Sequence, residues 1–451
     1  MLVALLLMLA PTQAKTDGSH SVVSPDTDGD VGRFTSLTLD ASGHPVIAYY
    51  DVTNGDLKLL HCGDPNCTSH NSVTSPDTQG TVGQFLSLVL DAAGNPVISY
   101  RDSDNEDLKL LHCNDPNCAG DDESITSPDS QGIVGAFSSL VLDSQGFPVV
   151  SYRNAPDPDL KLLHCNDANC AGGDESIELP DTMGVVGSYT SLKLDPLGYP
   201  VISYRDSTNR DLKVLHCDDP NCSGENESIS SPDTSGDVGL WTSMALDSEG
   251  HPVISYYDWT NTSLKLLRCF DPDCAFENSI VSPDTDGNMG AWSSLALDGS
   301  GRPVVSYFDG NTGDLKVLRC GNQRCSADNS IVAVDTGTKV GTHTSLVLDS
   351  DGYPIVAYFD SANGDLKLLH CFDSTCAAKP IETPIEVHGD ANCNGLVDSI
   401  DAAIILQWDA GLLESLTCAE RADANNDGTV DSIDAALVLQ FTAQLLSRLP
   451  P

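Results

Sequence analysis

Positive charge is scarce in this sequence, and so are long apolar runs. Its 451 residues include 22 Lys or Arg against 66 Asp or Glu, which gives a net charge of −44. Nucleic acids and anionic membrane surfaces are bound through basic faces, so this charge balance excludes both classes of partner. No stretch reaches the ~18 consecutive apolar residues of a transmembrane helix. We therefore expect no membrane span.

An apolar run opens the chain. Residues 1–14 contain LVALLLMLA and end in Thr12-Gln13-Ala14, which is typical of the apolar core and small-residue cleavage site of a signal peptide. A basic stretch before the run is missing, so the segment is a whole or a partial signal peptide. The 16 cysteines favour disulfides and an oxidising compartment. We predict a secreted, extracellular protein, free or held at a cell surface.

Cysteine pairs repeat along the chain. Four residues separate the cysteines of each pair, and the first cysteines follow one another at intervals of 51 or 52 residues. This period is typical of the blades of a β-propeller, and we expect each pair to form a disulfide. The pairs are Cys62–Cys67, Cys113–Cys118, Cys165–Cys170, Cys217–Cys222, Cys269–Cys274, Cys320–Cys325 and Cys371–Cys376.

Each repeat contains the pattern of four short strands. In the first repeat they are expected at Ser36–Asp40, Pro45–Tyr50, Leu57–His61 and Asn71–Thr74, separated by turn residues. Four antiparallel strands repeated seven times predict an all-β, seven-bladed β-propeller. We place it at residues 15–378.

One copy of the fourth-strand sequence is left over. Ser21-Val22-Val23 precedes the first full repeat, and Pro380-Ile381-Glu382 follows the last. We expect one of them to complete the last blade and close the ring, and the sequence leaves open which. The motifs Gly-x-Pro-Val-Ile-Ser-Tyr, Asp-Leu-Lys-Leu-Leu and His-Cys-x-Asp-Pro-x-Cys resemble propeller repeats of exported bacterial proteins. That resemblance implies the fold and no particular reaction.

A histidine precedes the cysteine pair in five repeats, which raises the alternative of a metal clip. Arg268 and Arg319 stand there in two repeats, and because arginine does not ligate metals, we favour the disulfide. Aspartates such as Asp51 and Asp56 flank the turn after the second strand and are interpreted as turn residues. The Pro-Asp string, first met at Pro25-Asp26, is interpreted as a loop. The histidines are His61, His112, His164, His216 and His370.

Two positions vary around the ring and are candidates for a ligand site. The first follows the tyrosine of the second strand and is arginine in three adjacent repeats, which suits the binding of carboxylates or phosphates. The alternative is that these arginines pair with aspartates of their own repeat, such as Asp102 or Asp206. In chain order the position holds Tyr50, Arg101, Arg153, Arg205, Tyr257, Phe308 and Phe359.

The second variable position precedes the first strand and carries an aromatic side chain or histidine in every repeat. Rings at a channel mouth stack on sugars, and the alternative is packing between blades. We take Tyr189, Trp241 and Trp292 as the candidate ligand residues. The full series is Phe34, Phe85, Phe137, Tyr189, Trp241, Trp292 and His343.

After the repeats, residues 379–388 are expected to form a linker, and residues 389–447 contain one segment twice at an offset of 33 residues. Each copy matches an EF-hand calcium loop, with oxygen ligands at positions 1, 3, 5, 7, 9 and 12 and glycine at position 6. We predict two bound Ca²⁺ ions. The ligands are Asp390, Asn392, Asn394, Leu396 (carbonyl), Asp398 and Asp401 in loop one, and Asp423, Asn425, Asp427, Thr429 (carbonyl), Asp431 and Asp434 in loop two.

Each calcium loop leads into an amphipathic helix, expected at 400–413 and 433–446. Two loop–helix units without an entering helix resemble a type I dockerin, and this resemblance implies a cohesin-like partner. Serine fits the family pattern for partner recognition, whereas isoleucine replaces its usual polar residue. Cys393 and Cys418 are the remaining cysteines, so we expect them to pair. The recognition positions implied by the resemblance are Ser399, Ile400, Ser432 and Ile433.

The sequence contains no nucleophile elbow, no zinc-protease motif and no phosphate loop. We therefore predict a monomeric binding or display protein that is not an enzyme. Its propeller would recognise a glycan or a protein, and its dockerin-like module would dock to a cohesin. One alternative is a polysaccharide-degrading enzyme of glycoside hydrolase type, and another is a structural surface protein.

Overall fold

The computed structural model describes residues 15–16, 19–120, 122–224, 226–377, 388–393, 397–413, 415–416, 418–425, 427–443 and 446. The chain divides into two compact units, with the boundary between residues 377 and 378. The first unit is built from strands and the second from helices. The predicted signal peptide, residues 1–14, lies outside the described residues, as does all of the predicted linker except His388.

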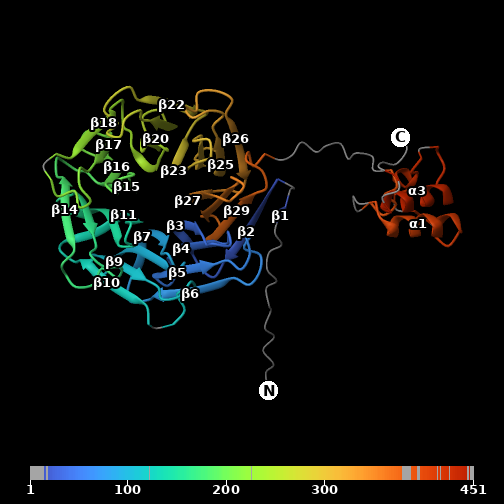
Figure 1. Ribbon diagram of the computed structural model, residues 1–451, viewed down its shortest axis with the longest axis horizontal. Coiled ribbons are helices and arrows are strands. Elements are labelled where there is room, and N and C mark those ends of the chain that lie inside the picture. The colour runs from blue at the N-terminus through green and yellow to red at the C-terminus, as the bar shows by residue number, and fades with distance from the viewer. Residues whose placement is uncertain are drawn as a thin grey trace, which may run out of the picture. The chain divides into compact units, whose positions relative to one another are not determined.

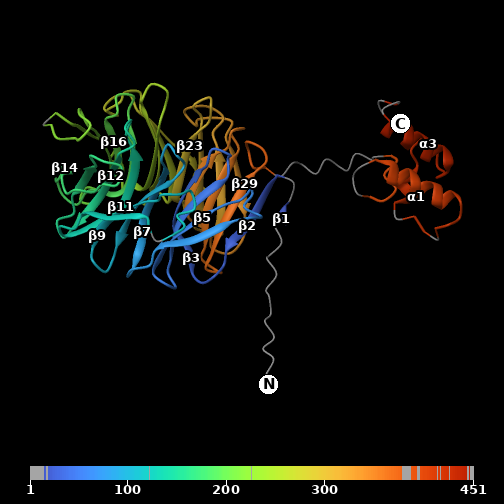
Figure 2. The same ribbon diagram turned by 60° about the horizontal axis from the view of Figure 1, so that its bottom comes forward.

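Seven β-sheets stand around a common axis and form the ring seen in Figure 1 and, tilted, in Figure 2. Every sheet has four antiparallel strands, and one sheet carries a short fifth strand at its edge. The predicted seven-bladed β-propeller is confirmed.

The innermost strand of each blade contacts the innermost strands of both neighbouring blades. Its serine accepts a hydrogen bond from the next blade, as at Ser36 Oγ, 3.0 Å from the backbone nitrogen of Leu88. Its register with the second strand shifts in its first half, which marks a β-bulge. The innermost strands are β3 (Val31–Leu39), β7 (Val82–Leu90), β11 (Ile133–Leu142), β15 (Ser188–Leu194), β19 (Leu240–Leu246), β23 (Met289–Leu297) and β27 (Val340–Leu348).

The second strand of each blade is the most buried one. It starts at a proline, because the first residue of a strand tolerates the missing N–H, and its tyrosine is fully buried. The second strands are β4 (Pro45–Asp51), β8 (Pro96–Asp102), β12 (Pro148–Ala155), β16 (Pro200–Asp206), β20 (Pro252–Asp258), β24 (Pro303–Asp309) and β28 (Pro354–Asp360).

The two outer strands complete each blade. The blade disulfide lies at the end of the third strand, and in the first six blades it is part of the connection to the fourth. The third strands are β5 (Asp56–His61), β9 (Asp107–His112), β13 (Leu160–His164), β17 (Asp211–His216), β21 (Ser263–Arg268), β25 (Asp314–Arg319) and β29 (Asp365–Cys371). The fourth strands are β6 (Ser72–Asp77), β10 (Ser124–Asp129), β14 (Ser176–Asp181), β18 (Ser228–Asp233), β22 (Ser279–Asp284), β26 (Ser330–Asp335) and β2 (His20–Asp26).

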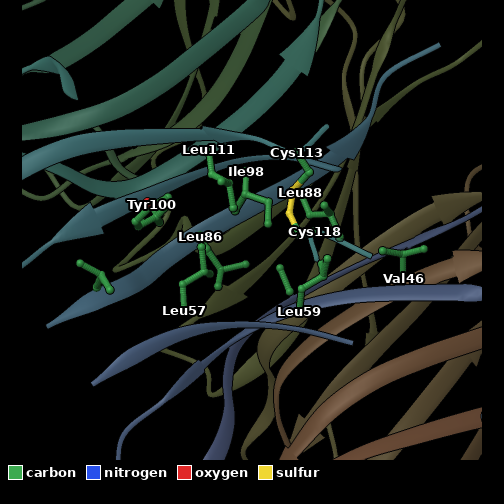
Figure 3. Packing of buried hydrophobic residues seen from close by; sticks show 12 residues of the cluster. Val46, Leu57, Leu59, Leu86, Leu88, Ile98, Tyr100, Leu111, Cys113 and Cys118 are labelled. Carbon is green, nitrogen blue, oxygen red and sulfur yellow. A yellow bond between two sulfur atoms is a disulfide. The ribbon is translucent and has the colours of Figure 1, made fainter. Parts of the chain in front are cut away.

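The hydrophobic core lies between adjacent blades. The cluster in Figure 3 joins Val46 and Leu59 of the first blade to Leu88 and Tyr100 of the second, with the disulfide Cys113–Cys118 at one side. The disulfides predicted for the seven blades are all formed. Because each core needs two blades, no blade is expected to be stable alone.

A buried aspartate ties each fourth strand to the following blade. Asp26 accepts a hydrogen bond from the Tyr49 hydroxyl (2.6 Å) and pairs with Lys58 Nζ (2.6 Å). The tyrosine–aspartate bond recurs at the other six junctions. Burial and the adjacent carboxylate raise the pKa of Tyr49 well above its ordinary value. The interpretation of the Pro-Asp string as a loop is therefore wrong, because it ends a strand and anchors the next blade.

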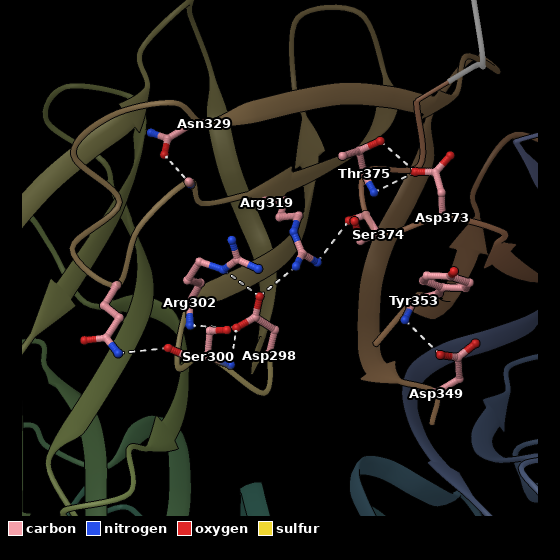
Figure 4. A network of polar contacts seen from close by, with 12 residues as sticks. Asp298, Ser300, Arg302, Arg319, Asn329, Asp349, Tyr353, Asp373, Ser374 and Thr375 are labelled. Atoms are coloured by element: carbon pink, nitrogen blue, oxygen red, sulfur yellow. Dashed lines mark hydrogen bonds and ion pairs between the residues drawn. The ribbon is translucent and has the colours of Figure 1, made fainter. Parts of the chain in front are cut away.

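The residue before each cysteine pair also joins two blades. His61 Nε2 lies 3.1 Å from Asp40 Oδ2 of its own blade, and its Nδ1 lies 3.0 Å from Asn117 Oδ1 of the next. Arg319 takes the same role through Asp298 (2.7 Å) and a carbonyl of the next blade (3.2 Å), as Figure 4 shows. The metal clip is thus wrong, and the shared requirement for a hydrogen-bond donor explains why arginine replaces histidine.

The N-terminal segment closes the ring. β2 pairs with β29 as the fourth strand of the last blade, so in Figure 1 the blue strand lies beside the orange one. β1 (Lys15–Thr16) pairs with the outer edge of β2. The other candidate, residues 380–382, lies outside the described residues.

Deleting residues 15–24 is expected to lower the midpoint of thermal unfolding by several degrees. The deletion leaves the last blade with three strands and exposes β29 as an unpaired edge, while Asp26 and its ion pair stay in the chain. Differential scanning calorimetry measures the midpoint. Deleting residues 380–382 is the matched control and should leave it unchanged. Equal midpoints for the 15–24 deletion and the full chain would contradict closure by β2.

The C-terminal unit contains α1 (Ser399–Asp409), α2 (Ala419–Ala422) and α3 (Ser432–Thr442). α1 and α3 end before the expected residues 413 and 446; at α1, Gly411 has a φ of 69°, which terminates a helix. A disulfide joins Cys393 to Cys418. The buried apolar side chains in the described part of this unit are mostly alanines: Ala391, Ala402, Ile405, Ala422, Ala424, Ala435 and Val438.

Candidate functional site at the channel mouth and in the calcium loops

Seven side-chain rings meet around the propeller axis, one from each innermost strand. Neighbouring centroids lie 4.6–5.6 Å apart around the whole circle, which is direct contact. Burial and the charge of Arg33 lower the pKa of the single histidine in this circle to about 3, so it is neutral. We call the set the aromatic ring: Phe34, Phe85, Phe137, Tyr189, Trp241, Trp292 and His343.

The aromatic ring depends on an unusual backbone. All seven residues have φ between 50° and 57°, in the left-handed region that aromatic residues rarely adopt. Each such residue costs on the order of 1–3 kcal/mol, which the surrounding structure must offset. The strain coincides with the β-bulges of the innermost strands. Strained positions of this kind cluster at binding and catalytic sites.

The aromatic ring surrounds a cavity of about 210 Å³. The residue after each ring member also lines it, and in most blades its hydroxyl donates to the ring member of the preceding blade, as from Thr242 to the carbonyl of Tyr189 (2.6 Å). Leu86 lacks this hydroxyl. Ligand pockets usually measure ~300–1,000 Å³. The cavity therefore accommodates one group of a larger ligand. The ring members pack against one another between blades, as one interpretation predicted, and they also face this cavity, so stacking on a sugar stays a prediction.

The three arginines flank the aromatic ring on the second strands β8, β12 and β16. Arg153 donates to Ser188 Oγ (3.0 Å), and Arg205 pairs with Asp237 of the following connection (2.8 Å). Arg101 has no hydrogen bond or ion pair within the described part of the chain. The Nε atoms of all three are buried without a hydrogen-bond partner among the described residues. These guanidinium groups thus retain free donors.

The alternative pairing of these arginines with Asp102 or Asp206 is wrong. Asp206 accepts hydrogen bonds from the backbone nitrogen (3.0 Å) and the side-chain amide (2.9 Å) of Asn209, and Asp102 does the same with Asn105. The aspartates after the second strand therefore hold the turn, as the sequence pattern indicated.

Tyr189 is the member of the aromatic ring whose pKa is affected by two of the arginines. Burial raises the pKa of Tyr189, and the positive charges of Arg205 and Arg153 oppose that rise. Burial likewise lowers the pKa of Arg153. Two guanidinium groups thus place positive charge and hydrogen-bond donors beside one phenol.

Two residues near Arg205 and the aromatic ring were not predicted from the sequence. Asp237 is the partner of Arg205, and Trp259, which follows β20, is 58 % exposed. Trp259 could have been identified from the sequence, because the corresponding residue of each other repeat is not aromatic. Asp237 could not, because the arginine with which it pairs lies in another repeat.

The second calcium loop draws its predicted oxygen ligands together. Asp423 accepts hydrogen bonds from the backbone of Asp427 (3.2 Å) and Gly428 (2.7 Å), and the side chain of Asn425 donates to Asp427 (3.0 Å). Asp434 is fully buried. Burial, and to a smaller extent the charge of Asp423, raises the pKa of Asp434 despite its backbone hydrogen bonds. A set of oxygen donors with excess negative charge, two of them buried carboxylates (Asp423 and Asp434), fits Ca²⁺.

The first calcium loop repeats this arrangement. Asp401 is fully buried and accepts hydrogen bonds from the backbone of Ala391 (3.1 Å), Asn392 (3.2 Å) and Asp398 (2.9 Å), as Asp434 does in loop two. Asp390 is also fully buried. The predicted ligands Asn394 and Leu396 lie outside the described residues.

The positions implied for partner recognition lie on the surface. Ile400 is 57 % exposed at the start of α1, and Ile433 is 55 % exposed at the start of α3. Ser399 and Ser432 beside them are exposed too. The unit thus presents the same Ser-Ile pair at two equivalent places.

Comparison with known proteins identifies the C-terminal unit. Residues 388–441 match the dockerin type I domain family, so the predicted type I dockerin is confirmed. Domains of this family bind calcium and dock to cohesins. No curated protein sequence matches the chain significantly. None of the helices in the described ranges is long and apolar enough to cross a membrane.

The propeller resembles solved structures in fold. An oligogalacturonate lyase in complex with manganese is 10 % identical, with a TM-score of 0.51 over 81 % of this chain and 96 % of that one. A puromycin hydrolase is 13 % identical, with a TM-score of 0.50 over 79 % of this chain and 55 % of that one. The polysaccharide lyase Uly1 is 11 % identical, with a TM-score of 0.49 over 77 % of this chain and 91 % of that one.

These similarities correct the prediction that the chain is not an enzyme. The oligogalacturonate lyase and the puromycin hydrolase are both enzymes, and at these identities they establish a shared fold. The missing sequence motifs are no argument against activity, because propeller enzymes assemble their sites from residues of several blades.

Proposed function

We propose that the propeller binds and cleaves a polysaccharide that contains uronic acid, and that the dockerin domain attaches this exported enzyme to a cohesin-bearing partner. The observation that carries the proposal is the cluster of Arg153, Tyr189 and Arg205 at the aromatic ring. Guanidinium groups recognise the carboxylate, and aromatic faces recognise the sugar ring.

The composition of the cavity favours a lyase over a glycoside hydrolase. Hydrolysis needs two carboxylates flanking the scissile bond, whereas the described residues that line the cavity include no Asp or Glu. The arginines lie outside this lining as well, but the charges of Arg153 and Arg205 act on Tyr189, which lines the cavity. In β-elimination, neutralising the uronate carboxylate makes the adjacent C–H bond more acidic. Arg153 supplies that charge, and Arg205, whose own charge is partly offset by Asp237, adds to it. The C–H proton then passes to water, its electron pair forms the C=C bond as the C–O bond to the leaving sugar breaks, and the protonated hydroxyl of Tyr189 donates its proton to the leaving oxygen. An oligogalacturonate lyase is built on the same fold, so the scaffold admits such chemistry.

The dockerin domain supplies attachment. We propose that it holds two Ca²⁺ ions, one in each loop, with Asp390, Asp398 and Asp401 among the ligands of the first and Asp423 and Asp434 among those of the second. The ions neutralise buried carboxylates and fix the loops before α1 and α3. The exposed Ser-Ile pairs at these helix starts then face the cohesin.

Arg153→Ala combined with Arg205→Ala is expected to lower kcat/KM on a uronic-acid polymer by at least about a hundredfold, because each of the two charged hydrogen bonds contributes about 1.5–3 kcal/mol. Polygalacturonate, alginate and glucuronoxylan are the substrates, and ultraviolet absorbance of the unsaturated product measures elimination. Tyr189→Phe should keep binding and lose turnover. Arg324→Ala, which removes an exposed arginine of an outer loop, should change neither quantity.

The outcome separates binding from catalysis. Binding without unsaturated product would leave a recognition module and contradict the lyase. Binding of none of the three polymers, or unchanged kinetics in the double variant, would contradict the assignment of the cluster. Measurements belong at about 0.15 M salt, because screening there limits repulsion between a polyanion and a protein of charge −44.

A further inference from the structure

We propose that Trp259 forms an outer sugar-binding subsite, in which its indole stacks on a second sugar ring of the chain held at Tyr189. This inference rests on the proposed function and adds the path along which the polysaccharide lies. The ligand it implies is an oligosaccharide, bound through ring faces as well as through its carboxylate.

Trp259 is singular among the seven blades. It is 58 % exposed in the connection after β20. An exposed tryptophan gains little for folding, and tryptophan is enriched where large ligands bind. The corresponding residues in the other repeats carry small or aliphatic side chains: Val52, Ser103, Ala155, Ser207, Gly310 and Ser361.

A continuous line of rings connects Trp259 to the aromatic ring. Trp259 lies 6.0 Å from Tyr257, edge to face, and Tyr257 lies 5.6 Å from Trp241, measured between centroids. Trp241 lies 5.5 Å from Tyr189. In blades two to four, arginine occupies the position of Tyr257. The line of rings from Trp259 to Tyr189 therefore passes through Tyr257 of blade five.

Asp237, the ion-pair partner of Arg205, holds the backbone of Trp259 in place. The backbone nitrogen of Trp259 donates to the carbonyl of Asp237 (2.8 Å), and the nitrogen of Asp237 donates to Thr260 Oγ1 (2.7 Å). Asp237 carries the carboxylate that pairs with Arg205. One residue therefore links the carboxylate-binding group to the stacking group.

The neighbouring rings are fixed as well. The hydroxyl of Tyr257 donates to Asn288 Oδ1 (2.6 Å) of the next connection. A Cβ added to Gly236 would lie 2.7 Å from Thr260 Oγ1, so the two connections that hold Trp259 are in close contact. A platform that is rigid before binding loses little conformational entropy when the sugar arrives.

The Trp259 subsite presents an uncharged face to its ligand. The carboxylate of Asp237 is neutralised by Arg205, and the exposed indole offers stacking without a charge. The subsite therefore recognises the C–H face of a pyranose, acidic or neutral. A monosaccharide cannot occupy the cluster and Trp259 together, whereas a longer chain can.

Trp259→Ala is expected to weaken binding of polygalacturonate-derived hexasaccharides about tenfold and to leave binding of galacturonate unchanged. Isothermal titration calorimetry on the full chain with calcium measures both. Trp259→Phe should restore most of the affinity. The matched control is Phe276→Ala, which removes another exposed aromatic (75 % exposed) from the outer connection of the same blade, and it should bind like the wild type.

The results distinguish this inference from the proposed function. If the wild type binds the hexasaccharide and Trp259→Ala binds it equally well, the outer subsite is wrong and the proposed function stands. If Trp259→Ala weakens both ligands equally, the indole supports the cluster and is no separate subsite. If the wild type binds neither ligand, both the proposed binding of galacturonate chains and the Trp259 subsite are wrong.

Discussion

Removing calcium is expected to unfold the C-terminal domain and leave the propeller folded. Among the described residues of this domain, the buried apolar ones are five alanines, one isoleucine and one valine, too small a core to outweigh chain entropy without further support. In such a domain, the free energy of binding a structural metal contributes directly to the free energy of folding. Without cations, the buried carboxylates of Asp401 and Asp434 lose the charge that compensates them.

Circular dichroism measures this prediction. Excess EDTA should abolish most of the helical signal and the cohesin binding, and added Ca²⁺ should restore both, while the near-ultraviolet signal of the propeller aromatics persists. Asp434→Asn and Asp401→Asn should each weaken calcium binding at one loop, and a stoichiometry near two in the wild type and near one in each variant would support one ion per loop. A helical signal unaffected by EDTA would contradict the prediction.

Replacing Lys265 with methionine is expected to destabilise the propeller by about 3–5 kcal/mol, the usual cost of breaking a buried ion pair from one side. Lys265 Nζ lies 2.8 Å from Asp233 and 3.0 Å from Asp258, both of which are buried. The variant leaves two buried carboxylates without a cation at the junction of blades four and five. The midpoint of chemical unfolding measures the loss.

The third blade offers a natural control. Asn154 stands there in place of the second aspartate, and Lys161 has one carboxylate partner, Asp129, at 2.5 Å. Lys161→Met should therefore cost less than Lys265→Met. Adding Asp258→Asn to Lys265→Met gives the side-chain set that Lys161→Met leaves in the third blade, with one buried carboxylate in place of two, and should recover part of the lost stability. Equal costs for the two lysine variants would contradict this account.

The same ion pairs give stability a pH dependence of known sign. Burial alone would raise the pKa of Asp258, but hydrogen bonds from Asn261 and Lys265 hold it below its ordinary value. The pKa of Lys265 is raised, because its two carboxylate partners outweigh its burial. The pair thus contributes fully at neutral pH, loses its contribution as pH falls through the lowered pKa of Asp258, and loses it again above the raised pKa of Lys265.

Local order along the chain was readable from the sequence. Cys62 and Cys67 are five positions apart, and the calcium ligands from Asp423 to Asp434 span twelve, so spacing alone brings them together. Strand alternation within each repeat likewise depends on neighbours in the chain. For this reason the propeller, its disulfides and the dockerin type were predictable.

Contacts between blades were decided by the tertiary structure. Repetition shows that Asp26, Tyr49 and Lys58 recur, but their meeting across a blade junction depends on how far each sheet is rotated about the axis. Closure by β2 depends on a pairing more than 300 residues away in the chain. Arg205 and Trp259 converge on Asp237 for the same reason. The sequence by itself determined the blades and the calcium loops, and only the packing of blade on blade decided where the strained aromatic ring, the arginines and an exposed indole come together.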